Sequence, residues 1–296
     1  MHPSPLNNEQ PQSVTPELLA GWPLPSLEEG KAKRGQALII AGGVEMPGGA
    51  VLTGTAALRA GAGVVQVATA ESAVLAVATA VPELYVVGIA SGDERRQESL
   101  RTVVELAKLA QAVLIGPGLR DVEVIRSVLP ELLAMEHLDA LIIDAKAIPI
   151  AAEFLPAKGK LRGKTILTPH AGEMDDIAKA SQEEIEKDPL RVAREVAEQL
   201  GSVILLKQGP KVLICAADGP AYLNKGGNVG LDTAGSGDVL AGMLAGLCAR
   251  GVEPLQAAVH GASAIARAGE KLAWQVGPVG YLASELLPEL PLLLAP

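Results

Sequence analysis

The chain has 296 residues, of which 49% are hydrophobic and 20% are charged, and its formal net charge is −9. This length and apolar content suffice for one large α/β domain, whereas the negative charge argues against binding to nucleic acid, which requires clustered lysine and arginine. No apolar run reaches the roughly 18–20 residues that span a bilayer, and the polar, proline-rich start lacks the apolar core of a signal peptide, so we expect a cytoplasmic protein with no membrane partner.

Residues 1–30 are expected to form an N-terminal arm with one helical turn at Pro16–Ala20, followed by a single domain over residues 31–296. From Gln36 onward, apolar runs alternate with amphipathic segments, which is typical of βαβ units and a largely parallel sheet. Runs such as Ala37–Ala41 are apolar on both faces, as a sheet covered by helices on both sides requires. The stretch 218–233 is rich in Gly and Asn and predicts an edge hairpin that leads into a loop.

The expected strands are short and apolar, and they are Ala37–Ala41, Val64–Ala68, Leu84–Gly88, Ala112–Ile115, Ala140–Asp144, Thr165–Leu167, Val203–Leu206 and Val212–Ala216. The expected helices are Ala50–Ala60, Ser72–Val81, Leu100–Ala110, Val122–Ala134, Gly172–Lys179, Pro189–Leu200, Gly237–Arg250, Pro254–Trp274 and Tyr281–Leu290. The predicted fold class is therefore α/β, with a mostly parallel central sheet.

The segment Thr233–Asp238, with the sequence TAGSGD, directly precedes a helix of small apolar residues. Small residues at a helix start let the backbone approach a ligand, and the free N–H groups at the positive end of the helix dipole bind anions. Asp238, just inside the helix, would then be placed to accept a proton from a hydroxyl that attacks a bound phosphate. The alternative is an ordinary glycine-rich turn in which Asp238 only begins a helix.

Two further segments follow strand ends, where the ligands of open α/β sheets bind. The first is Leu167–Glu173 (LTPHAGE), in which His170 is a catalytic candidate or an ordinary loop histidine. In the same segment, Glu173 is either a ligand of a metal-bound water or merely a good first-turn helix residue. The second is Leu206–Lys211 (LKQGPK), which indicates a phosphate-binding lysine or, alternatively, a hairpin turn with two solvated lysines.

Two glycine-rich loops and one carboxylate also follow apolar strands. The loop Ile40–Ala50 (IAGGVEMPGGA) can wrap the phosphates or sugar of a dinucleotide, but it lacks the GxGxxG spacing of NAD-dependent dehydrogenases. The turn Ile115–Leu119 (IGPGL) is either structural or part of a ligand site. Asp144 ends a strand, where it presents a carboxylate to the ligand edge or caps the next helix.

In their order and spacing, these segments resemble the ADP/ATP-dependent NAD(P)H-hydrate dehydratases, members of the ribokinase-like superfamily, as do GNVGLDTAGSGDVLAGMLAGL from Gly227 and GYLASELLPELP from Gly280. The similarity runs from about Lys31 to Pro291. It implies a ribokinase-like three-layer α/β/α sandwich and a stand-alone dehydratase without the epimerase domain of longer members. It further implies NAD(P)H-hydrate as substrate, ADP or ATP as phosphoryl donor, Mg²⁺, a homotetramer, and functional pairing with a separate epimerase.

The resemblance also implies roles for individual residues. Asp238 matches the catalytic aspartate and a substrate contact, and Ala50, Gly118 and His170 match the other positions that touch the hydrated cofactor. Glu173 resembles the superfamily glutamate that organises magnesium through water. The nucleotide contacts fall on two loops, and they are Lys207, Gln208, Gly209, Pro210, Lys211, Ala234, Gly235, Ser236 and Gly237.

Three departures from the family pattern bear on the donor. Lys146 stands where the family usually has the second aspartate of Asp-Ala-Asp, Asp232 and Ala234 stand where it has Ala and Gly, and Gln208 separates the common Lys-Gly pair. Two alternative functions remain open at this point. One is a small-molecule kinase of the same superfamily, acting with ATP on a vitamin-precursor alcohol, although TPHAGE and GYLASELLP favour the dehydratase. The other is a catalytically inactive nucleotide-binding or scaffold protein.

Overall fold

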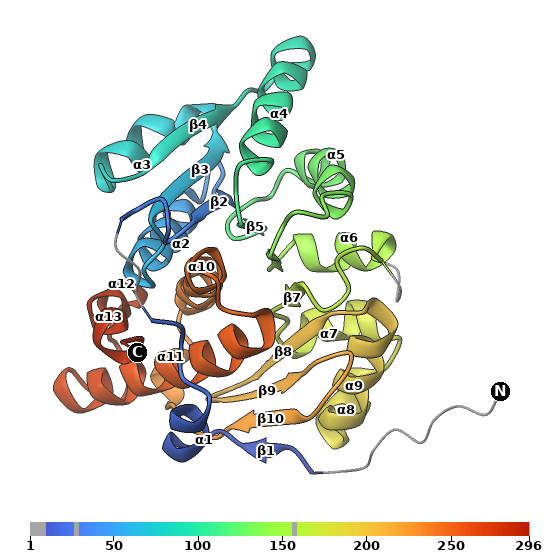
Figure 1. Ribbon diagram of the computed structural model, residues 1–296, viewed down its shortest axis with the longest axis vertical. Coiled ribbons are helices and arrows are strands. Elements are labelled where there is room, and N and C mark those ends of the chain that lie inside the picture. The colour runs from blue at the N-terminus through green and yellow to red at the C-terminus, as the bar shows by residue number, and fades with distance from the viewer. Residues whose placement is uncertain (1–9, 27–29, 156–158, 296) are drawn as a thin grey trace.

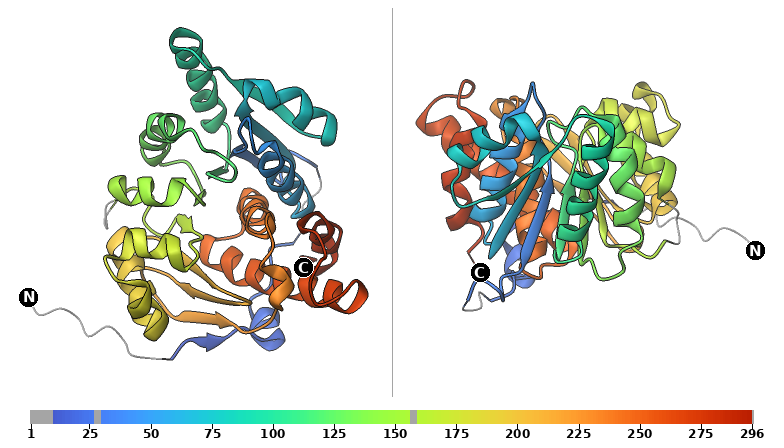
Figure 2. Two further views of the ribbon diagram at one scale, coloured as in Figure 1. Left: turned by 180° about the vertical axis from the view of Figure 1, so that it is seen from behind. Right: turned by 90° about the horizontal axis from the view of Figure 1, so that it is seen from above.

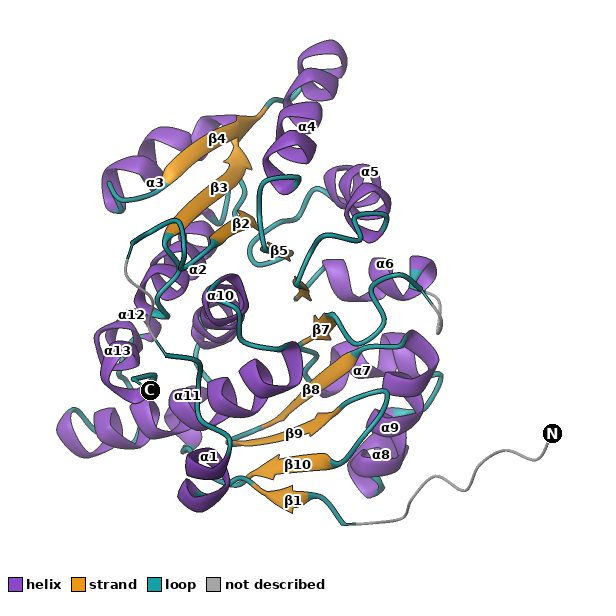
Figure 3. Ribbon diagram, in the orientation of Figure 1, coloured by secondary structure: helices purple, strands orange, loops and turns teal. Residues whose placement is uncertain are grey.

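A single sheet runs through the centre of the protein (Figures 1 and 3). The computed structural model describes residues 10–26, 30–155 and 159–295. Within these ranges the sheet has ten strands in the order β1-β10-β9-β8-β7-β6-β5-β2-β3-β4. The strands are β1 (Gln12–Ser13), β2 (Gln36–Ile40), β3 (Val64–Ala70), β4 (Tyr85–Ile89), β5 (Ala112–Ile115), β6 (Ala140–Ile143), β7 (Thr165–Leu167), β8 (Val203–Gln208), β9 (Lys211–Cys215) and β10 (Ala221–Asn224).

The seven strands from β2 to β8 are parallel to one another, β9 and β10 continue the sheet antiparallel, and β1 is parallel to β10. The chain starts the parallel sheet in its middle, because β2 lies between β3 and β5. It then adds β3 and β4 on one side of β2 and β5 to β8 on the other. The chain after β2 leads to β3 on one side, and the chain after β5 leads to β6 on the other side. The loops that follow β2 and β5 therefore diverge at the carboxyl ends of these two strands, which is where open α/β sheets form ligand crevices.

Helices cover both faces of the sheet, as the view from above in Figure 2 shows. Successive residues of a strand point to opposite faces, so Ile39 packs in one core and Leu38 and Ile40 pack in the other. The first core lies under α2 (Pro47–Arg59), α3 (Val74–Ala80), α10 (Ser236–Ala249), α11 (Pro254–Gln275) and α12 (Ala283–Leu286). The second lies under α4 (Asp93–Ala107), α5 (Val122–Leu133), α6 (Ala147–Phe154), α7 (Ala171–Ala178), α8 (Gln182–Lys187) and α9 (Pro189–Leu200).

The predicted fold class and all eight predicted strands are confirmed, with ends that differ by a few residues. The remaining elements differ where the sequence signal is weak or interrupted. The helix expected from Leu100 begins at Asp93, because its first two turns are polar and exposed and show no apolar face. The helices α6 and α8 were not predicted, since the first follows its strand after only three residues and the second has only six residues.

The expected helix Tyr281–Leu290 is wrong as one element. It is divided into α12, the 3₁₀ turn η3 (Leu287–Glu289) and α13 (Leu290–Leu293), and Pro288 and Pro291 stand near the starts of the last two pieces. Proline has no backbone N–H to continue a helix, which explains the breaks. The helix expected from Ser72 likewise starts as the 3₁₀ turn η1 (Glu71–Ala73) before α3.

The described part of the N-terminal segment packs on the rest of the chain. Its helical turn is α1 (Pro16–Gly21), as predicted, and β1 adds an unpredicted strand beside β10. The carbonyl of Trp22 accepts hydrogen bonds from Gln256 at 3.0 Å and His260 at 2.8 Å, both on α11. The Trp22 ring also lies 6.0 Å from the ring of Tyr222. This segment therefore covers the N-terminal turns of α11 and the edge of the sheet at β10.

Candidate active site

The sheet order lines up the residues of the candidate site. Lys207 lies near the end of β8, His170 follows β7, Asp144 follows β6, Gly118 follows β5 and Gly42 follows β2. These strands are consecutive neighbours and parallel, so all five residues lie at one edge of the sheet, in that order. Residues more than 160 positions apart in the sequence are thereby brought into a single row.

The N-terminus of α10 faces this row. Gly235, at the helix N-cap, has a φ of +94°, and a Cβ atom there would lie 2.6 Å from Cδ1 of Leu52. The Ser236 hydroxyl donates to the carbonyls of Leu231 at 2.7 Å and Thr233 at 3.0 Å, which fixes the loop before the helix. The N-cap Gly235 has no side chain to cap α10, and the N–H of Ser236 donates to the carbonyl of Thr233 at 3.3 Å. The N–H groups of Gly237 and Asp238, which follow in the first turn, are therefore available to an anion.

Two glycines allow α10 to approach α2 closely. A Cβ atom on Gly242 would lie 2.3 Å from the carbonyl oxygen of Thr53, and one on Gly246 would lie 2.4 Å from that of Ala57. Every residue of α10 from Val239 onward is buried. The helix is therefore fixed by packing on all sides, which holds its N-terminus rigidly over the sheet edge.

A carboxylate and an ammonium group connect the sheet edge to the helix. Asp144 is 3% exposed, and its Oδ1 accepts a hydrogen bond from the Thr168 hydroxyl at 2.5 Å. The Nζ of Lys207 lies 3.5 Å from the same oxygen. It also lies 3.4 Å from the position that a Cβ of Gly237 would take, which places the ammonium group beside the first turn of α10.

Asp238 occupies the first turn of α10 and is partly buried. Burial, and next the negative charge of Asp144, raise the pKa of Asp238 to about 6, and the positive charge of Lys207 acts in the opposite direction. A carboxylate with such a pKa is mostly ionised above neutral pH and is a stronger base than an exposed aspartate. The site therefore contains a base next to an anion-binding helix end.

His170 and Glu173 form a reciprocal capping box at the start of α7. The Nδ1 of His170 accepts the N–H groups of Gly172 at 3.0 Å and Glu173 at 3.2 Å, while the Glu173 carboxylate accepts the N–H of His170 at 2.9 Å. The imidazole is exposed and lines the neighbouring cavity. Within the described ranges, no three His, Cys, Asp or Glu side chains gather closely enough to hold a metal ion by themselves.

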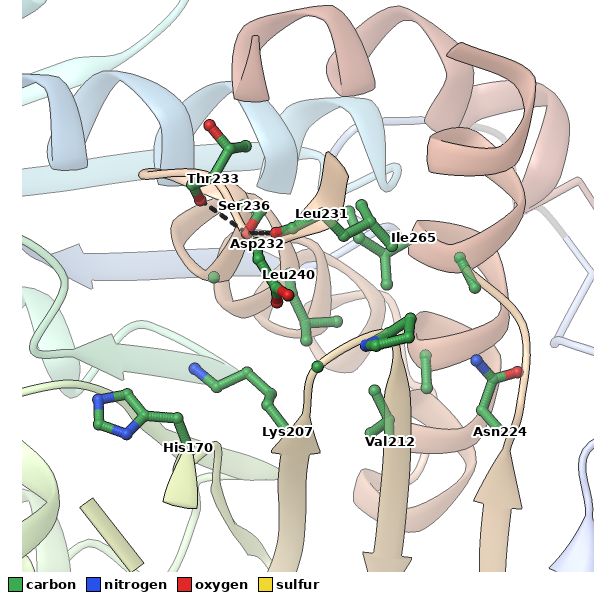
Figure 4. A pocket seen from close by; sticks show the side chains of 15 residues that line it. His170, Lys207, Val212, Asn224, Leu231, Asp232, Thr233, Ser236, Leu240 and Ile265 are labelled. Atoms are coloured by element: carbon green, nitrogen blue, oxygen red, sulfur yellow. Dashed lines mark hydrogen bonds between the residues drawn. The ribbon is translucent and has the colours of Figure 1, made fainter. Parts of the chain in front are cut away.

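A cavity of about 230 Å³ lies between the ends of β8 to β10 and the helices α10 and α11 (Figure 4). At one end it is polar, with Lys207, His170 and the start of α10. The rest of the lining is largely apolar, with Val212 and Ile265 away from Lys207, and the residues are Pro210, Val212, Asn224, Leu231, Leu240, Ala262, Ile265 and Ala266. A cavity that joins an anion-binding end to an apolar end matches the parts of a nucleotide, which joins phosphates to a base.

A second cavity of about 330 Å³ lies at the carboxyl ends of β2, β3, β4 and β5. Its floor includes Gly42 and Gly43, and its wall includes Arg96 and Arg120. The two glycine loops interlock here, because the N–H of Gly42 donates to the carbonyl of Pro117 at 2.7 Å. The strand order places Asp144 between this cavity and the first one.

Six of the fourteen predicted site residues line the first cavity, and they are His170, Lys207, Gly209, Pro210, Ser236 and Gly237. Asp238 and Glu173 lie next to lining residues but do not line the cavity themselves. Gln208 and Lys211 face each other across the β8–β9 turn and do not line the cavity, and neither do Ala234 and Gly235. Ala50 is fully buried, with its side chain close to Gly42, while Gly118 is partly exposed on the neighbouring loop.

Several lining residues were not predicted as site residues. Ala262, Ile265 and Ala266 belong to α11, and in the sequence they look like any other apolar positions on a buried helix face. Asn224, at the end of β10, and Thr233, in the loop before α10, lie within the Gly- and Asn-rich stretch 218–233. The high Gly and Asn content of this stretch was the sequence signal that could have indicated a functional region there.

A family model described as NAD(P)H-hydrate dehydratase matches residues 37–292 of the chain. The chain is 36% identical over 281 residues, covering 95% of each sequence, to the ADP-dependent (S)-NAD(P)H-hydrate dehydratase of Xanthomonas campestris. It spans about half the length of the bifunctional NAD(P)H-hydrate repair enzymes that it also matches, such as that of Moorella thermoacetica.

Solved structures with similar folds agree with these sequence relatives. The ADP/ATP-dependent NAD(P)H-hydrate dehydratase of Bacillus subtilis, co-crystallised with ATP and Mg²⁺, superposes with a TM-score of 0.78 and 28% identity, covering 97% of this chain and 98% of that one. A ribokinase-like superfamily protein of Enterococcus faecalis gives a TM-score of 0.81 and 26% identity, with 96% and 95% covered. These likenesses confirm the expected ribokinase-like sandwich.

Proposed function

The chain belongs to the NAD(P)H-hydrate dehydratase family, and from this premise we propose that it dehydrates NAD(P)H-hydrate to NAD(P)H with ADP as the phosphoryl donor. The observation that carries the proposal is the position of Asp238, a partly buried base in the first turn of α10, beside a cavity that joins an anion-binding end to an apolar region. The kinase alternative is not favoured, because the relatives that match nearly the whole chain are named dehydratases.

The donor nucleotide binds in the first cavity in this proposal. The N–H group of Gly237 and the ammonium group of Lys207 hold its phosphates, because these groups lie at the polar end. The turn of Gly209 and Pro210 closes the cavity on the other side. Gln208, Lys211, Ala234 and Gly235 act less directly, by setting the geometry of the two loops.

The hydrated cofactor binds on the side of the second cavity. Gly42 lines that cavity, and Gly118 and Ala50 lie against Gly42. The C6 hydroxyl of the hydrate then lies near Asp238, with His170 on the other side of the reacting centre. Such an arrangement brings the hydroxyl and the terminal phosphoryl group together from opposite directions, as phosphoryl transfer requires.

Asp238 accepts the proton of the C6 hydroxyl as its oxygen attacks the terminal phosphorus of the donor. The oxygen–phosphorus bond forms, and the donor leaves as AMP when it was ADP. The C6 phosphate ester is a much better leaving group than hydroxide. Electron release from the ring nitrogen breaks the C6–O bond, and loss of a proton from C5 restores the dihydronicotinamide ring with release of phosphate.

Mg²⁺ fits this site as an ion held mainly by the donor phosphates, because the described residues supply single carboxylates rather than a complete protein cage. Glu173 would hold it through a water molecule, using the carboxylate that also caps α7. The ion supplies charge neutralisation on the transferring phosphoryl group. Lys146, exposed at the N-cap of α6, supplies no carboxylate to it.

We also propose that the protein is a cytoplasmic homotetramer that works alongside a separate epimerase. The match to half of each bifunctional repair enzyme supports the functional pairing, since those proteins join two activities in one chain. Among the described residues, no helix is both long and apolar enough to cross a membrane.

The test is absorbance at 340 nm on NADH-hydrate with Mg²⁺, with ADP, with ATP and without nucleotide. Growth of the 340 nm band that requires a nucleotide and disappears in Asp238→Asn supports the dehydratase and identifies the donor. A flat trace with every donor, from a folded protein that binds nucleotide, refutes the proposal. Release of AMP and free phosphate in equal amounts from ADP checks the balance of the reaction.

A further inference from the structure

The loop before α10 points a carboxylate into the nucleotide cavity. Asp232 lines this cavity, and Figure 4 shows its side chain directed into it from above. Its Oδ2 lies 4.0 Å from the position that a Cβ of Gly209 would take, on the opposite wall. Among the described residues, no side-chain hydrogen bond or ion pair engages this carboxylate.

A charged carboxylate in a cavity for a phosphate-bearing ligand is unfavourable unless it contacts hydrogen-bond donors. Lys207 does not supply them, because its ammonium group is directed to Asp144 and the start of α10. The Asp232 side chain is exposed, so water solvates it while the cavity is open. A ligand that fills the cavity displaces this water and must supply hydrogen-bond donors in its place. An ionised carboxylate accepts hydrogen bonds only, and its two oxygens match two neighbouring hydroxyl groups.

The position of Asp232 within the cavity selects which part of the ligand it meets. The phosphate end is formed by Lys207 and the start of α10, and the apolar end includes Val212 and Ile265. Figure 4 shows the Asp232 carboxylate between these two ends. In any nucleotide the ribose lies between the phosphates and the base, so the ribose is the part that reaches Asp232.

We propose that Asp232 binds the 2′- and 3′-hydroxyl groups of the donor ribose and makes the enzyme select ribonucleotides. The inference rests on the nucleotide site of the proposed function, but not on the dehydration chemistry.

Calorimetric titration of the full chain with ADP, 2′-deoxy-ADP and 2′,3′-dideoxy-ADP, in the presence of Mg²⁺, tests the proposal. The wild type is expected to bind ADP about tenfold or more tightly than the dideoxy analogue. Asp232→Ala is expected to lose this discrimination by weakening ADP binding while leaving binding of the dideoxy analogue nearly unchanged. Asp232→Asn, which keeps the shape and one acceptor oxygen, should discriminate between the two nucleotides less than the wild type and more than Asp232→Ala.

Two results would overturn the proposal. One is equal discrimination in the wild type and Asp232→Ala, which would mean that the carboxylate does not contact the ribose. The other is a parallel change for all three nucleotides, which would mean that its charge acts on the phosphates or their cation. Glu253→Gln, which removes one exposed negative charge at the far end of α11, is the control for net charge.

The failures of the two proposals are distinguishable. A protein that discriminates riboses through Asp232 but shows no growth at 340 nm supports the ribose contact and refutes the dehydratase. A protein that is active on NADH-hydrate but binds all three nucleotides alike supports the dehydratase and refutes the ribose contact. Circular dichroism spectra that match the wild type show that each variant is folded before it is titrated.

Discussion

Replacing Asp238 by asparagine is expected to abolish activity and at the same time to stabilise the fold. The pKa of Asp238 rises from its ordinary value of 3.8 to about 6 in the folded protein, chiefly through burial. Folding therefore favours the neutral carboxyl group. The contribution of the neutral carboxyl group to the free energy of unfolding is complete below pH 3.8 and is lost as the pH rises through about 6. Asparagine is neutral at every pH and loses no such contribution.

The difference between the two pKa values is about 2.2, which corresponds to about 3 kcal/mol. Asp238→Asn should therefore exceed the wild type in free energy of unfolding by about 0.5 kcal/mol at pH 4 and by about 3 kcal/mol above pH 7. For a chain of 296 residues, the larger value corresponds to a rise in Tm of about 5 °C. The loss of the base should lower kcat at least about 100-fold.

Differential scanning fluorimetry of both proteins without nucleotide, from pH 4 to pH 8, measures this difference. A Tm advantage that grows with pH and levels off above pH 7 is the expected result. A variant that is less stable than the wild type at all pH values, or an advantage that does not depend on pH, refutes the electrostatic reasoning. Asp176→Asn, at an exposed position of α7, serves as the control and should show no such growth.

Three further predictions follow from named contacts. In pH profiles of kcat/KM, activity should fall at acid pH with a midpoint near pH 6, where Asp238 is protonated. Asp144→Asn should move this midpoint down and Lys207→Met should move it up, because the charges of Asp144 and Lys207 act on the pKa of Asp238 in opposite directions. Gly242→Ala should lower stability by about 1–3 kcal/mol in urea unfolding, because the new methyl group meets the Thr53 backbone, whereas Gly48→Ala, with open space around it, should not. Neither cysteine should react with Ellman's reagent at pH 8 until urea unfolds the protein, because both are buried and free and burial raises their pKa values.

The sequence determined the fold class because the signals involved are local. Strands such as Ala37–Ala41 are apolar on both faces, and only a sheet covered on both sides buries them. The helix after TAGSGD consists of small apolar residues and could be placed to within one residue at its start. The sequence also identified Lys207 and His170 as candidates, because they follow apolar strand runs at the edge where ligands of α/β sheets bind. It identified Asp238 because this residue stands just inside a helix that follows a run of small residues.

Local signals failed where neighbours decide the structure. Trp22 lies in the predicted N-terminal arm, where the sequence gives no sign of a tertiary contact. Its carbonyl nevertheless accepts hydrogen bonds from Gln256 and His260, more than 230 positions away. Strand β1 has two residues and exists only because β10 offers a free edge. In the C-terminal segment, the apolar pattern predicted one helix, and prolines divided it.

Only the tertiary structure decided how the candidate residues work together. Asp144, Lys207 and Asp238 come from three elements, and the strand order and the packing of α10 bring their charges together. Burial then raises the pKa of Asp238, and burial is a property of the whole fold rather than of the segment TAGSGD. A sequence specifies which groups are present and their local backbone, whereas the distances and desolvation that tune them depend on contacts between residues far apart in the chain.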